Sequence, residues 1–62
     1  MPKPRTTWAI WSYPVHNYLA GGWIASSVGR PYGDLRRIAR AMNRNGEGQR
    51  YVAVRYYGAP GG

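Results

Sequence analysis

The chain contains no cysteine, although it is only 62 residues long. A chain of this length forms one domain, and it buries only about 60% of the surface that its unfolded form exposes. Without cysteine it has no disulfide to support so small a core, and it lacks the thiolate ligands of the usual structural zinc site. The fold must therefore be held by packing, in which the three Trp and six Tyr residues are the largest side chains.

Positive charge is the second constraint, because nine Lys and Arg residues face only two acidic residues and give a net charge of +7. Eight of the nine are Arg, whose planar guanidinium forms two-pronged contacts with phosphate and carboxylate groups. A GC-rich genome also produces Arg-rich proteins, and both explanations remain open. The charge attracts polyanions, such as nucleic acid, an anionic membrane surface or an acidic protein surface.

The order of apolar runs and breakers predicts the elements strand, strand, helix, strand. The expected strands cover residues 6–13, 23–28 and 50–57, in which β-branched and aromatic residues are concentrated. Residues 14–22 contain Pro, Asn and a Gly pair, and they are expected to form a long loop.

A helix over residues 34–44 is the clearest element of the sequence. Its apolar side chains follow the i, i+3, i+4, i+7 spacing of an amphipathic helix, at Leu35, Ile38, Ala39 and Met42. Asp34 is expected to cap the N-terminus. Asn45-Gly46 is expected to end the helix in a left-handed conformation.

These elements predict an α+β fold, with a three-stranded sheet in the order 2-1-3 and one helix packed on one face. The first two strands form a hairpin, and the helix then crosses the sheet to a third strand beside the first. A winged DNA-binding unit is the competing interpretation, but it needs a second helix that the sequence does not offer. We expect one domain over residues 6–58, a flexible arm over 1–5 and a disordered tail over 59–62.

Four arginines share the helix face opposite the apolar one. On a helical wheel they fall within about 100° of one another. This set, the Arg stripe, consists of Arg36, Arg37, Arg40 and Arg44. No acidic residue lies among them, whereas solvated helix faces usually mix both signs of charge. We therefore predict that the stripe binds a polyanion mainly through phosphate contacts, extended by Arg30, Arg50 and Arg55, although an ordinary solvated face is the alternative.

The alternation of residues along the strands predicts a second surface, on the sheet face away from the helix. The helix-facing sets are expected to be Trp8, Ile10 and Ser12; Ile24, Ser26 and Val28; and Val52, Val54 and Tyr56. The opposite face is expected to carry Trp11, Tyr13, Trp23, Tyr51, Arg55 and Tyr57.

Three uses of this aromatic face remain open. It can stack nucleic-acid bases, it can form a protein interface such as a homodimer, or the 14–22 loop can cover it. The prediction also separates it from the Arg stripe, because the two surfaces lie on opposite sides of the molecule. A single short ligand is then unable to contact both.

The residue types that perform catalysis are scarce in this chain. The acid, base and metal-ligand candidates are His16, Asp34 and Glu47, and no thiol accompanies them. We predict a protein that is not an enzyme and that has no metal, cofactor or small-molecule substrate. The longest apolar run, residues 8–11, is too short to cross a membrane, and we expect a cytoplasmic protein without a membrane partner.

In chain length and element order, the layout resembles that of small phage-encoded inhibitors of bacterial RNA polymerase. No motif residues accompany this resemblance, which concerns layout alone. The leading prediction is a small basic protein that binds nucleic acid. The alternative is an inhibitor or modulator, encoded by a phage or mobile element, that docks on an acidic surface of a host protein such as RNA polymerase.

Overall fold

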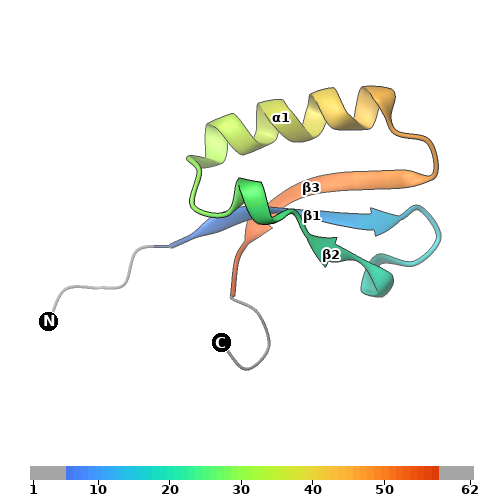
Figure 1. The fold of residues 1–62 in the computed structure, drawn as a ribbon, viewed down its shortest axis with the longest axis horizontal. Coiled ribbons are helices and arrows are strands. Elements are labelled where there is room, and N and C mark those ends of the chain that lie inside the picture. The colour runs from blue at the N-terminus through green and yellow to red at the C-terminus, as the bar shows by residue number, and fades with distance from the viewer. Residues whose placement is uncertain (1–5, 58–62) are drawn as a thin grey trace, which may run out of the picture.

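The computed structural model describes residues 6–57, in which three strands, one α-helix and two 3₁₀ turns follow one another (Figure 1). The expected arm over 1–5 and tail over 59–62 lie outside the described residues. In chain order the elements are β1 (Trp8–Pro14), η1 (Tyr18–Ala20), β2 (Gly22–Trp23), η2 (Ala25–Ser27), α1 (Tyr32–Asn45) and β3 (Gln49–Arg55).

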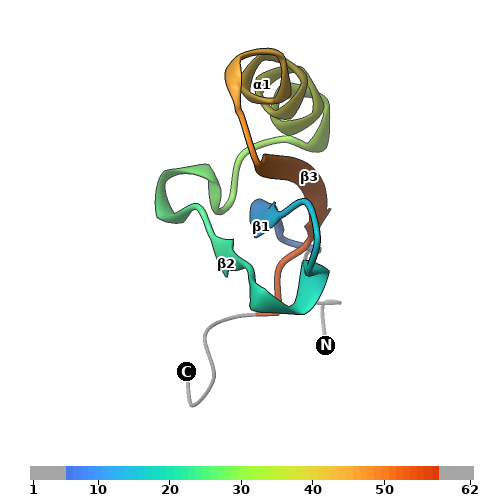
Figure 2. The same cartoon turned by 90° about the vertical axis from the view of Figure 1, so that its right-hand side faces the viewer.

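The strands form one sheet in the order β2-β1-β3, with both pairings antiparallel. The pairing of β1 with β3 is continuous from Trp8↔Arg55 to Pro14↔Gln49. By contrast, β2 pairs with β1 only at Trp11↔Trp23 and Ser12↔Gly22. Helix α1 lies on one side of this sheet, close to β3 (Figure 2). The predicted α+β class, strand order and single covering helix are confirmed.

The prediction of a strand over residues 23–28 is wrong beyond Trp23, because η2 follows in its place. The buried hydroxyl of Ser27 explains the change. It accepts a hydrogen bond from the Ile10 N–H at 2.8 Å and donates one to the Ile24 carbonyl at 2.6 Å. The Ser27 side chain thus forms the hydrogen bond to β1 that the backbone of a second strand was expected to form. This contact buries Ser27, whereas Ser26 was expected to face the helix.

Helix α1 begins at Tyr32, two residues before the predicted start, so Asp34 lies in the first turn and is not the cap. The carbonyl of Pro31 accepts the hydrogen bond of the Leu35 N–H at 3.1 Å. The ring of Tyr32 packs against Trp8, with 4.6 Å between the ring centroids. This tertiary contact supports an additional half-turn that local sequence signals do not indicate.

The helix ends at Asn45, close to the predicted end, but not through a left-handed glycine. Gly46 has φ −83°, and its N–H donates to the Met42 carbonyl at 2.8 Å. The positive φ of this connection belongs to Gly48, at 74°, directly before β3. A residue with a side chain is strained in that conformation, so Gly48 is the position that permits the turn.

The core lies between α1 and the sheet. Ile10, Leu35 and Ala39 are its buried members. The partly buried side chains packed against them are Trp8, Ile24, Ile38, Met42, Tyr51 and Ala53. The predicted apolar face of the helix and the predicted helix-facing residues Trp8 and Ile10 of the first strand are therefore confirmed.

The predicted phase of the third strand is wrong by one residue. Tyr51 and Ala53 face the helix, where Val52 and Val54 were expected. Val52 is instead paired with Trp11, on the opposite face. Each set of alternate residues in this strand contains two apolar residues, Tyr51 and Ala53 in one and Val52 and Val54 in the other, so a period of two does not distinguish them.

Candidate polyanion-binding surface

The exposed face of α1 carries the Arg stripe, as predicted. Its four members, Arg36, Arg37, Arg40 and Arg44, are all exposed. Within residues 6–57, one Arg side chain donates a hydrogen bond, and it lies outside the stripe: Arg30 Nε donates to the Ser26 carbonyl at 3.1 Å. The guanidinium groups of the stripe therefore keep their donors available for a ligand.

Three members of the stripe surround one surface depression. Arg36, Arg37 and Arg40 line it together with Gly33, and its volume is about 270 Å³. Gly33 has no side chain, which leaves room beside the guanidinium groups. Arg36 and Arg40 lie one helical turn apart, about 6 Å along the axis, so their like charges repel. A bound anion would remove this repulsion.

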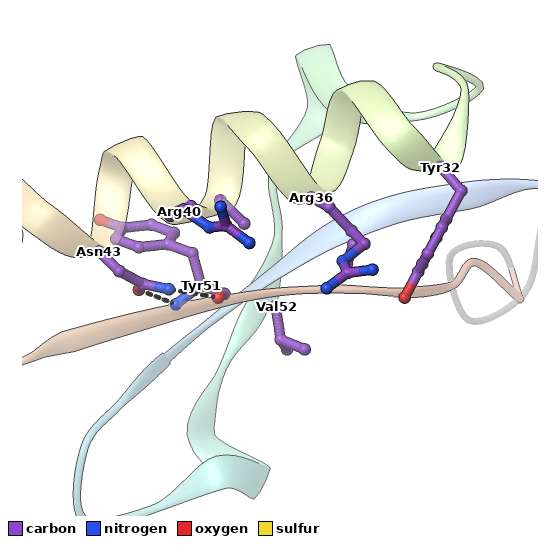
Figure 3. A pocket seen from close by; sticks show the side chains of 8 residues that line it. Tyr32, Arg36, Arg40, Asn43, Tyr51 and Val52 are labelled. Atoms are coloured by element: carbon purple, nitrogen blue, oxygen red, sulfur yellow. Dashed lines mark hydrogen bonds between the residues drawn. The ribbon is translucent and has the colours of Figure 1, made fainter.

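Arg36 and Arg40 also border a second hollow, a groove of about 280 Å³ between α1 and β3 (Figure 3). The other residues that line this groove are Tyr32, Ala39, Asn43, Tyr51, Val52 and Ala53. The guanidinium carbon of Arg36 lies 5.9 Å from the centroid of the Tyr32 ring, within cation–π range. Aromatic and cationic groups thus share one groove.

This groove corrects the placement of Tyr51. The residue was predicted on the aromatic face, away from the helix, but it packs beneath α1 beside Arg40. The strict separation of aromatic rings from the Arg stripe is therefore wrong for Tyr51, and a ligand in the groove reaches both kinds of group. The cause is the one-residue shift in the phase of β3.

The three arginines expected to extend the stripe line neither the depression nor the groove beside it. Arg30 precedes α1 and is hydrogen-bonded to Ser26. Arg50 is paired with Tyr13, so its side chain lies on the sheet face away from the helix. Arg55 is paired with Trp8 at the end of β3.

A second surface, the aromatic hollow, lies on the side of the sheet away from α1. It has a volume of about 440 Å³ and is lined by Trp11, Tyr18, Leu19, Trp23, Val54, Arg55 and Tyr57. Trp11 and Trp23 meet edge to face, with 4.9 Å between their centroids. Four of the residues predicted for this face line the hollow, namely Trp11, Trp23, Arg55 and Tyr57. Arg55 reaches it from the end of β3, although its pairing with Trp8 places it in the helix-facing set of that strand.

The loop over residues 14–22 covers part of this face. The ring centroids of Tyr18 and Tyr13 are 4.7 Å apart. The indole Nε1 of Trp11 donates a hydrogen bond to the Tyr18 carbonyl at 3.1 Å. Tyr13 therefore contacts the loop and does not line the hollow. Beside it, the Leu19 side chain is 88% exposed. Tyr18 and Leu19 were not predicted as site residues, and their only signal was apolar character within a loop.

The possible catalytic side chains are dispersed. His16, Asp34 and Glu47 are exposed and come from the turn after β1, the first turn of α1 and the turn before β3. Within residues 6–57, no cluster of three or more His, Asp or Glu side chains is placed to hold a metal ion. No helix in this part of the chain has the length and apolar character needed to cross a bilayer.

In comparisons with known proteins, no family model, curated protein or solved structure matches this chain.

Proposed function

We propose that this protein is a non-catalytic binding protein whose Arg stripe binds the phosphate backbone of nucleic acid. The observation that carries the proposal is the grouping of exposed guanidinium groups along α1, three of them around one depression. Phosphate contacts position a protein on nucleic acid but read no base sequence. We therefore expect weak sequence preference and strong dependence on salt.

Salt dependence measures the number of phosphates that the protein neutralises. Each neutralised phosphate releases condensed counterions, so log K falls with log salt by about 0.9 per contact on duplex DNA. Titrations on a duplex DNA and on a single-stranded RNA give this slope for both ligands. For Arg37→Gln and for Arg44→Gln, we expect the slope on duplex DNA to become less steep by about 0.9 in each variant.

Arg50→Gln is the matched control, because it removes the same charge from the opposite side of the sheet. If the stripe binds the phosphates, this variant keeps the slope of the parent protein. Equal losses in Arg37→Gln and Arg50→Gln would show that only net charge matters, and absence of binding at low salt would overturn the proposal.

A second candidate function is supported by the aromatic hollow. Leu19 and Tyr57, at its border, are 88% and 81% exposed, and exposed apolar patches are typical of protein interfaces. On this view the protein is a phage or mobile-element modulator that acts in the cytoplasm on a host protein, or it dimerises through this face.

The two functions respond differently to a change in the hollow. Leu19→Ser should abolish capture of an acidic host protein from nuclease-treated lysate, and it should leave the salt slope for DNA unchanged. Light scattering at increasing concentration tests the dimer, since a protein that stays monomeric at high concentration excludes it.

A further inference from the structure

Strand β3 has one long edge with which no element of residues 6–57 pairs, because the sheet order is β2-β1-β3. In an antiparallel pair, alternate residues direct their N–H and C=O groups toward the partner strand. The Tyr56 N–H donates to the Thr7 carbonyl of the β1 side, so the even-numbered residues face β1. The backbone groups of Tyr51, Ala53 and Arg55 therefore point to the open edge.

At Tyr51 this edge already receives the contacts that a neighbouring strand makes. The Asn43 side chain donates to the Tyr51 carbonyl at 2.9 Å and accepts from the Tyr51 N–H at 2.8 Å. Asn43 thus occupies the place of a strand residue at this position only. At Ala53, the next residue along the edge, both the donor and the acceptor remain open.

The groove between α1 and β3 runs beside this open edge, and Arg36 and Arg40 project into it from the helix (Figure 3). These arginines are one turn apart, which corresponds to about 6 Å along the helix. Residues i and i+2 of an extended chain face the same side and are about 6.6 Å apart. Because α1 runs along β3, an added strand would present alternate side chains at nearly the spacing of the two guanidinium groups (Figure 1).

We propose that the groove binds an extended acidic segment of a partner protein, which pairs with the open edge of β3 at Ala53 and places alternate carboxylates against Arg36 and Arg40. The site adds a second kind of ligand to the proposed nucleic-acid binding. Arg37 and Arg44 of the stripe do not line this groove, so the two activities can be separated by mutation.

The chemistry of the edge favours a peptide over nucleic acid in this groove. A peptide supplies both a donor and an acceptor to the N–H and C=O of Ala53, whereas a phosphodiester backbone supplies acceptors. Arg also forms two parallel hydrogen bonds with a carboxylate. A second copy of this chain is unsuitable, because its net charge of +7 would bring more cations to Arg36 and Arg40.

The probe is a short synthetic peptide in which Glu alternates with Thr, and binding is measured by calorimetry. The control peptide has the same composition but repeats Glu-Glu-Thr-Thr, so that no two Glu residues stand at positions i and i+2. We expect the alternating peptide to bind at least about tenfold more tightly, because only its carboxylates match the two guanidinium groups while its backbone pairs with β3. Equal affinities would mean that charge alone attracts the peptide, and they would overturn the proposal.

Backbone pairing is tested without changing the protein. N-methyl groups are placed on the Glu residues in one peptide and on the Thr residues in another, since the two sets direct their N–H groups to opposite edges. One methylated peptide should lose binding and the other should keep it, and the sensitive set also gives the strand direction. If both methylated peptides lose binding, or if both keep it, the proposed backbone pairing with β3 is wrong.

Two measurements on the protein locate the site. The peptide should slow hydrogen exchange of the Ala53 amide, and an unchanged exchange rate contradicts pairing at this edge. Arg40→Gln should weaken peptide binding about tenfold, whereas Arg44→Gln, which removes the same charge outside the groove, should leave it within about twofold. Equal losses of peptide affinity in the two variants would overturn the assignment. So would a single-stranded RNA that displaces the peptide and itself slows hydrogen exchange of the Ala53 amide.

Discussion

The carboxamide of Asn43 on α1 makes two hydrogen bonds to the backbone of Tyr51 on β3, one to its carbonyl at 2.9 Å and one from its N–H at 2.8 Å. Only eight residues separate the two in the chain, so this contact joins the last turns of the helix to the first residues of the strand. It holds β3 in the phase that turns Tyr51 toward the helix. The Tyr51 ring then contributes to the groove that Arg36 and Arg40 border.

Asn43→Ala is expected to lower the free energy of unfolding by about 1–3 kcal/mol, since the partly buried backbone groups of Tyr51 lose both partners. Urea denaturation measures the change. Asn45→Ala is the matched control, because exposed Asn45 makes only a 3.4 Å hydrogen bond to the Ala41 carbonyl. Similar destabilisation of both variants would contradict the role of Asn43.

Ser27→Ala is expected to destabilise the fold by about 1–3 kcal/mol. The substitution leaves the N–H of Ile10, a buried residue, without the hydroxyl that accepts its hydrogen bond at 2.8 Å. Thermal unfolding followed by circular dichroism measures the loss. Ser26→Ala changes the neighbouring exposed serine and should shift stability by less than about 0.5 kcal/mol. Equal effects would mean that the buried hydroxyl is not what holds η2 to β1.

Gly21→Ala is expected to destabilise the fold, whereas Gly22→Ala, its matched control, should leave the stability unchanged. A Cβ at Gly21 would collide with the Ser12 carbonyl oxygen and lie 2.6 Å from Nε1 of Trp11, whereas a Cβ at Gly22 meets nothing within 4 Å. Overpacking of this kind costs about 1–3 kcal/mol. The fluorescence of the three Trp residues should also change in Gly21→Ala, because the contact displaces Trp11. If Gly21→Ala keeps the stability and fluorescence of the parent protein, the close packing of Gly21 against Ser12 and Trp11 is contradicted.

Leu35→Ala is expected to abolish most of the cooperative unfolding transition. Leu35 is fully buried, and its truncation costs about 2–5 kcal/mol, which is a large part of the roughly 3–9 kcal/mol available to a chain of this size. Leu19→Ala is the matched control, because Leu19 is 88% exposed and should change stability by less than about 0.5 kcal/mol. Calorimetry separates the two cases, and a native-like melt of Leu35→Ala would contradict the assigned core.

Local periodicity was sufficient for the helix and for the first strand. The i, i+3, i+4, i+7 spacing places Leu35 and Ala39 toward the core and the Arg stripe toward solvent. In the first strand, Trp8 and Ile10 alternate with Ala9 and Trp11, and the structure places Trp8 and Ile10 in the core as predicted.

The second and third strands depended on contacts that no local pattern contains. The expected strand over 23–28 is mostly replaced by η2, because the Ser27 hydroxyl reaches Ile10, 17 residues away. In β3, Val52 and Tyr51 are both suitable for a buried face. The structure selects Tyr51 through the side chain of Asn43.

Composition and helical periodicity were enough to show that the chain is strongly basic, that its small core relies on packing without disulfides, and that four arginines lie on one face of a helix. These properties follow from composition and from the fixed geometry of an α-helix, which depends only on nearby residues. The tertiary structure alone decided that Arg36 and Arg40 share a groove with Tyr51 and the open edge of β3. That juxtaposition depends on which face of β3 turns toward α1, and contacts between elements decide the face when both alternate sets contain apolar side chains.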